Sequence, residues 1–72
     1  MNFINDDIKI DFSVPANIQE FIEIAEKADR ENHLGTYIAY ADGIDVAAKN
    51  AYVAGKLTHR QWDLLCMRYT QQ

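Results

Sequence analysis

Residues 55–62 read Gly-Lys-Leu-Thr-His-Arg-Gln-Trp, and this stretch decides the fold prediction. Thr58 and Gln61 fit a capping box, in which each side chain bonds the backbone N–H of the other residue at the start of a helix. Leu57 just before the cap and Trp62 four positions after it fit the hydrophobic staple that accompanies such a start. The stretch therefore predicts that a helix begins immediately after a tight turn.

Two predicted helices flank this turn, 36–54 before it and 58–70 after it. Gly55 ends the first, because glycine adopts the left-handed conformation of a helix end without steric cost. The competing interpretation makes 36–41 a strand, but the helical spacing continues unbroken through Gly43. Apolar residues recur three or four positions apart, as on one buried face of each helix: Tyr37, Tyr40, Ala41, Ile44, Ala47, Ala48 and Ala51, then Trp62, Leu65, Cys66 and Tyr69.

A further helix is predicted over 15–33, with Pro15 at its start and Gly35 just beyond its end. Upstream, residues 8–14 alternate apolar and polar side chains, which is the period of a strand with one buried face. No second strand is predicted, so the backbone groups of the arm, residues 1–14, need another partner. The arm is expected either to fold over its own helices or to pair with another chain.

The predicted fold is therefore mostly α. It is a single domain of residues 1–72, in which an extended or β-like N-terminal segment precedes a three-helix bundle. A tight αα-hairpin joins the second and third helices of this bundle. A domain of this size has a small core, which gives about 3–5 kcal/mol of stability.

Composition narrows the function classes. The chain has 72 residues, one cysteine and a formal net charge of -4. One cysteine excludes an internal disulfide framework and, with no leader-like N-terminal run, predicts a cytoplasmic protein. No stretch reaches the roughly 18 apolar residues of a membrane span, and the acidic balance makes nucleic acid an unfavourable partner.

The motifs of catalytic and cofactor sites are missing from the sequence. The three glycines are isolated, so no phosphate-binding loop can be placed. His33, His59 and Cys66 lack the spacing of metal ligands. His59 and Cys66 are separated by about 10.5 Å along a helix, too far for direct proton transfer. We expect no catalytic residue, metal or cofactor, and Cys66 is expected to be a small buried apolar side chain.

Two surface features indicate binding instead. Residues 1–45 carry ten acidic and three basic side chains, a net charge of -7, whereas 46–72 carry one and four, a net charge of +3. Within the basic part lies a candidate basic tip at the turn, suited to an acidic partner or to phosphate: Lys56, His59 and Arg60. A second apolar stripe on the last two helices is a candidate interaction patch: Val46, Val53, Leu64 and Met67.

These features predict a small protein that docks on another protein as an adaptor, inhibitor or accessory factor. A weak homodimer that covers the apolar patch is also expected from so small a core. The alternative is a DNA-binding regulator that uses residues 55–68. In a helix-turn-helix, however, the position of Gln61 should be apolar, and Trp62 follows one place late. By composition the chain also looks like phage or mobile-element accessory proteins.

The pattern Gly55-x-Leu57-Thr58-x-x-Gln61-Trp62 resembles the turn of short bacterial SHOCT-type helical hairpins. The resemblance covers these eight residues and implies the hairpin alone.

Overall fold

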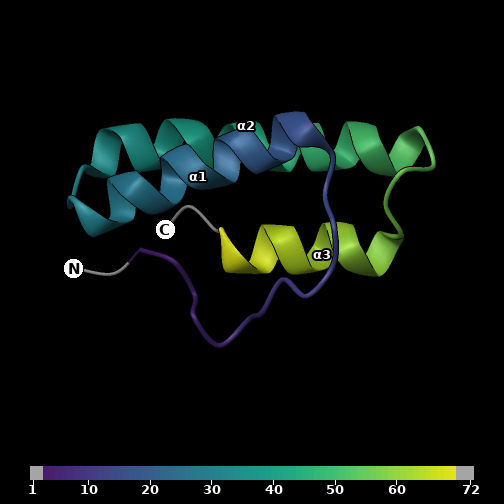
Figure 1. The fold of residues 1–72 in the computed structure, drawn as a ribbon, viewed down its shortest axis with the longest axis horizontal. Helices are drawn as coiled ribbons and strands as arrows, with labels where there is room; N and C mark the ends of the chain where they lie inside the picture. The colour runs from purple at the N-terminus through teal and green to yellow at the C-terminus, as the bar shows by residue number, and fades with distance from the viewer. Residues whose placement is uncertain (1–2, 70–72) are drawn as a thin grey trace.

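The structure is a computed structural model that describes residues 3–69. Those residues form three helices, α1 (Ala16–Arg30), α2 (Leu34–Val53) and α3 (His59–Arg68), and no strand (Figure 1). The prediction of a mostly helical chain with three helices is therefore confirmed. None of these helices is both long enough and apolar enough to cross a membrane.

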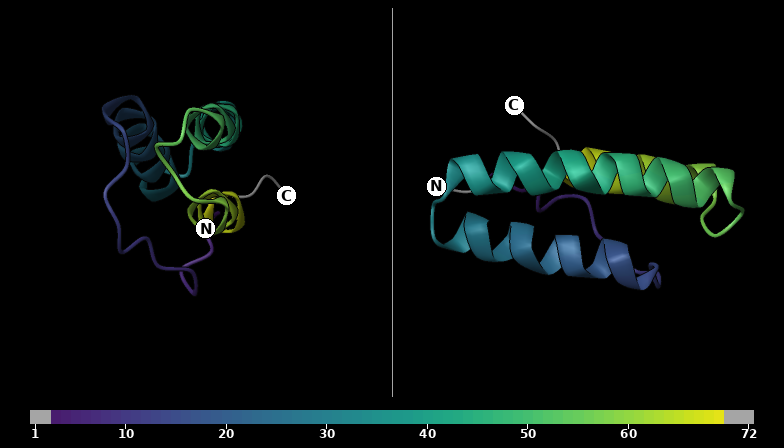
Figure 2. Two further views of the ribbon diagram at one scale, coloured as in Figure 1. Left: turned by 90° about the vertical axis from the view of Figure 1, so that its right-hand side faces the viewer. Right: turned by 90° about the horizontal axis from the view of Figure 1, so that it is seen from above.

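Helix α2 is the centre of the fold. Its 20 residues run along most of the 34 Å length of the molecule. It packs against both α1 and α3, whereas the backbones of α1 and α3 do not come into contact. Helices α2 and α3 run antiparallel as a hairpin (Figures 1 and 2). The core between the helices contains four fully buried large side chains: Tyr37, Ile18, Ile44 and Leu65.

The hairpin turn has the structure that its sequence predicts. The Thr58 hydroxyl accepts the Gln61 N–H at 3.1 Å, and the Gln61 carbonyl oxygen accepts the Thr58 N–H at 2.9 Å. Gly55 has φ +79°, and the N–H of Lys56 donates to the carbonyl of Ala51. The conformation of Gly55 and the hydrogen bond from Lys56 end α2 in a Schellman motif, which satisfies carbonyls that the helix itself leaves unpaired.

The end of α1 and the start of α2 differ from the prediction, whereas the course of α2 through Gly43 agrees with it. Helix α1 ends at Arg30, and Asn32, with φ 59°, takes the left-handed position expected of Gly35. Gly35 lies instead in the first turn of α2, which begins at Leu34 and not at residue 36. The helix does continue through Gly43, so the strand interpretation of 36–41 is wrong. A Cβ at Gly43 would lie 3.3 Å from the Phe21 ring, and the glycine therefore lets α1 pack closely.

The prediction of a strand or extended segment is wrong for the described part of the N-terminal arm, residues 3–14. The arm is irregular, with a turn in which the Ile8 N–H donates to the Asn5 carbonyl at 3.2 Å. Its apolar side chains at positions 8, 10, 12 and 14 are nevertheless half-buried, while the polar residues between them are exposed. The alternation therefore reports burial of one side of the arm, and no β-ladder is needed to produce it.

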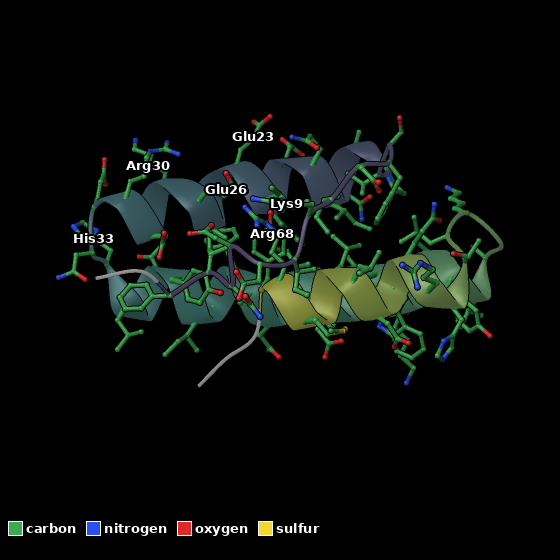
Figure 3. All side chains as sticks on the ribbon, turned by 90° about the horizontal axis from the view of Figure 1, so that it is seen from below. Lys9, Glu23, Glu26, Arg30, His33 and Arg68 are labelled. Carbon is green, nitrogen blue, oxygen red and sulfur yellow. The ribbon has the colours of Figure 1, made fainter. Side chains whose placement is uncertain are left out.

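Arg68 holds the arm against the helices (Figure 3). Its guanidinium donates to the Ile8 carbonyl at 2.7 Å and pairs with Glu26 of α1 at 3.6 Å. The Asn5 N–H donates to the Arg68 carbonyl at 3.0 Å. The Tyr69 hydroxyl completes the network by donating to Glu26 at 2.7 Å. These contacts bridge α1 and α3, whose backbones do not themselves meet.

The arm leaves three residues of the second apolar stripe uncovered, namely Val46, Val53 and Met67. It passes along the side of the molecule that joins α1 to α3 (Figure 2). Val46 and Val53 remain 54% and 75% exposed, and Met67 remains 51% exposed. Of the two arrangements expected, the arm folds over its own helices, but the face that it covers is not the predicted apolar patch.

Replacing Arg68 with Met is expected to lower the free energy of unfolding by about 2–3 kcal/mol. Methionine keeps an apolar stem of similar length but leaves the two ends of the network, the Ile8 carbonyl and Glu26, without their charged donor. Urea unfolding of both proteins gives the difference. A loss below about 0.5 kcal/mol would mean that these contacts do not stabilise the fold.

Candidate docking surface at the α2–α3 hairpin

An aromatic cluster lies at the end of the hairpin where the turn joins α2 to α3. Tyr52, near the end of α2, stacks on Trp62 of α3 with ring centroids 5.3 Å apart and planes inclined by 25°. His59 contacts both rings edge-on at 5.5 Å. The capping box starts α3 at His59 and so presents His59 and Trp62, which are three residues apart, on one side of that helix. Aromatic rings in this arrangement attract one another beyond the effect of burial alone.

Two exposed cations lie at the same end of the hairpin. Lys56 is in the turn, and Arg60 is in the first turn of α3. Asp63 is next to His59 and pairs with its Nδ1 at 3.2 Å, so the only nearby carboxylate on α3 faces the imidazole. The three residues of the aromatic cluster and the two cations together form what we call the hairpin-end surface: Tyr52, Lys56, His59, Arg60 and Trp62.

The structure brings the predicted basic tip together, since Lys56, His59 and Arg60 are all exposed at one end of the hairpin. Residues 46–72 contain one more base on α3, Arg68, and it is not available to a partner. Its side chain is only 15% exposed because the arm and Glu26 surround it. The positive charge at the C-terminal end of α3 is therefore used inside the fold.

The predicted apolar patch is divided between two sides of the molecule. Val46 and Val53 lie opposite the buried line of α2, seven residues and so about two turns apart. Leu64 is half-buried and precedes Arg68 by one helical turn, so it lies on the side of α3 that faces the arm. Met67 is exposed. Val46 and Val53 therefore form a face of their own, and Leu64 does not belong to it.

Cys66 has a different environment from the one predicted. It is half-buried and not in the core, and its thiol donates to the Asp45 carboxylate at 3.0 Å, which joins α3 to α2. Burial, followed by the hydrogen bond and the charge of Asp45, raises the pKa of the Cys66 thiol to about 12. The thiolate, which is the reactive form, is therefore disfavoured at neutral pH.

Alkylation of native Cys66 is expected to be at least about tenfold slower at pH 8 than alkylation of the unfolded chain, because so little thiolate is present. Asp45→Asn removes the neighbouring charge, so the pKa should fall and the rate should rise. Iodoacetamide labelling followed by mass spectrometry measures both rates. Labelling of the native protein at the unfolded rate would contradict this environment for the thiol.

A shallow groove of about 340 Å³ lies between the arm, α1 and the end of α3. Its polar lining includes Glu26, Arg68 and Tyr69, which already pair with one another. Those groups therefore serve to hold the arm. In residues 3–69, no three His, Cys, Asp or Glu side chains are grouped so that they could hold a metal ion.

No protein-family model matches the chain, and no curated protein or solved structure matches it either.

Sequence reasoning did not find Tyr52 or Asp45 as site residues. A signal was present, because residues equally distant from the turn face each other across an antiparallel hairpin. Counted from the ends of the turn 54–58, Tyr52 lies two residues before it and Trp62 four after it, while Asp45 lies nine before it and Cys66 eight after it. Each pair is therefore brought to a similar level of the hairpin. The contact of Arg68 with Ile8 joins residues sixty positions apart, and no local pattern indicates it.

Proposed function

We propose that this chain acts without catalysis, by docking on an acidic surface of another protein through the hairpin-end surface. The observation that carries the proposal is an aromatic cluster, with Tyr52 and His59 exposed, at the same end of the hairpin as two cations that have no ion-pair partner within residues 3–69. Tyr52 is 38% exposed although it stacks on Trp62, and Lys56 and Arg60 project from the same end. Tyr, Trp and Arg are the residue types that dominate binding energy at protein interfaces.

Charge supports an acidic protein partner over nucleic acid. The whole chain carries -4, which would repel a phosphate backbone from most of its surface. Arg68, at the other end of α3, is occupied by the arm and Glu26 and so is not available to a phosphate backbone. Helices α2 and α3 are also antiparallel (Figure 2), whereas a helix-turn-helix crosses its two helices at a steep angle. The single half-buried thiol is compatible with our proposal of a cytoplasmic location.

A capture experiment with matched charge reversals tests this function. Wild type, Lys56→Glu/Arg60→Glu and Lys27→Glu/Arg30→Glu are each used as bait in native lysate. The last variant makes the same change of charge on α1, where both side chains are exposed. We expect at least one acidic protein that is captured by the wild type and the α1 variant but lost with the hairpin variant. Identical capture by all three proteins would contradict the proposal.

Duplex DNA of random sequence provides the second arm of the experiment. A DNA-binding regulator would bind it with micromolar affinity that falls steeply as salt is added. We expect no such binding, and its observation would replace protein docking with the DNA-binding alternative.

A further inference from the structure

The outward side of α2 has a regular pattern, and no other element within residues 3–69 covers it. Six residues alternate at spacings of four and three along it, and every one of them is exposed. We call them the α2 outer face: Gly35, Ala39, Asp42, Val46, Lys49 and Val53. The alternation of four and three is that of a seam along which one helix packs on another. The opposite side of the same helix already faces the core.

The two valines make this face unusual for a surface helix. Val53 is the most exposed large apolar side chain of the described residues, at 75%, and Val46 is 54% exposed. Valine also has a lower helix propensity than the Lys, Glu or Gln common on exposed helices. Neither residue is explained by helix formation or by packing inside the chain.

Two free charges on the same face identify what could cover it. Asp42 precedes Val46 by four residues, and Lys49 follows it by three. Within residues 3–69 neither of the two has an ion-pair partner. The face therefore carries one anion and one cation at nearly equal distances on either side of a central valine.

This pattern is complementary to itself when the helix is reversed. With a two-fold axis at Val46, a rise of about 1.5 Å per residue brings Asp42 to within about 1.5 Å of the partner's Lys49 along the helix axis. Val53 then lies opposite the small Ala39 of the second copy, seven residues from the axis in each chain. A parallel arrangement would instead place Asp42 against Asp42 and Lys49 against Lys49, which repel.

We propose that two copies of this chain associate through the α2 outer face as an antiparallel, two-fold symmetric pair centred on Val46. The contact is isologous, since each copy contributes the same residues. It is separate from the hairpin-end surface, which lies at the end of the hairpin and stays accessible in the pair. One helix from each copy gives a small interface, so we expect a dissociation constant of about 10 μM to 1 mM.

Sedimentation equilibrium from about 10 μM to 1 mM tests the pairing. The wild type is expected to change from monomer to dimer across this range. Val46→Lys should remain a monomer throughout, because two lysines would meet on the axis. Lysine favours helix more than valine does, so unfolding of the monomer cannot explain that loss. Circular dichroism of the variant verifies its helical content.

Charge exchange tests the register and direction. Asp42→Lys and Lys49→Asp should each weaken the dimer at least about tenfold, since both place like charges together. The double variant Asp42→Lys/Lys49→Asp should dimerise as the wild type does, and a mixture of the two single variants should form a heterodimer. Glu20→Lys makes the same charge change as Asp42→Lys but lies on α1, and it should leave the dimer intact.

A wild type that is monomeric at 1 mM would overturn the proposal. A dimer that survives Val46→Lys, or single charge variants that the double exchange does not rescue, would overturn it as well. The hairpin variant Lys56→Glu/Arg60→Glu should dimerise normally, so a failure of docking and a failure of self-association are separate results.

Discussion

Replacing Tyr37 with Ala is expected to unfold this protein at room temperature. Tyr37 is 1% exposed, and its ring packs on Phe3 of the arm with centroids 5.3 Å apart. Removing a buried aromatic side chain costs about 3–5 kcal/mol, which equals the whole stability expected of a domain this small. The substitution leaves a cavity where α1, α2 and the arm meet. Circular dichroism should show loss of most of the helix signal.

Tyr37→Phe is the matched control, because it keeps the ring and removes only the hydroxyl. The hydroxyl donates to the Phe3 carbonyl at 3.4 Å, a long hydrogen bond, so we expect a loss of about 1 kcal/mol or less. If Tyr37→Ala instead stays folded with cooperative urea unfolding, the arm and α1 must repack around the missing ring.

Alkaline solution is expected to unfold the protein before pH 12. Burial raises the pKa of Tyr37 from 10.0 to about 12, helped by the charge of Asp29. Burial and the hydrogen bond to Glu26 do the same for Tyr69. Above pH 10 the native state keeps protons that the unfolded chain has lost, so stability is full below that pH and falls as pH rises. Each tyrosine accounts for up to about 2–3 kcal/mol of this fall.

The thiol of Cys66 extends this loss to lower pH. Its pKa rises from 9.0 to about 12 for the reasons of burial and proximity to Asp45, so its contribution begins near pH 9. A pH titration followed by circular dichroism and tyrosine absorbance gives the midpoint. Tyr37→Phe removes one of the titrating groups, and we expect its midpoint to be higher than that of the wild type. Cooperative native structure that persists at pH 12 would contradict burial of both phenols.

The hairpin could be predicted from sequence because its signals are local. The capping box needs only Thr58 and Gln61, and the positive φ of Gly55 needs only a glycine at a helix end. The predicted end of α1 is too late in the chain. Gly35 is the usual residue for the left-handed position at a helix end, but Asn32 also tolerates that conformation and takes the position here. The alternation in residues 8–14 predicts a strand that does not form, because alternating burial has the same period whether or not a second strand is present.

The two candidate surfaces differ in how local their residues are. The basic tip lies within one turn of chain, and the structure shows its three residues exposed together. The apolar patch joined two helices whose relative rotation the sequence does not specify, so Leu64 was grouped with Val46 and Val53 although it faces the arm. Cys66 fits an apolar stripe, but its thiol also donates to Asp45, twenty-one residues away, which no local pattern indicates.

Photo-crosslinking from inside the hairpin-end surface tests the central claim most directly. A benzoylphenylalanine in place of Tyr52 retains an aromatic ring there, and one in place of Glu20 on α1 is the control. In native lysate we predict a discrete adduct with an acidic protein from position 52, no such adduct from position 20, and loss of the adduct when Lys56→Glu/Arg60→Glu is added. The same adducts from both positions, or an adduct that survives the charge reversal, would contradict docking through the end of the hairpin.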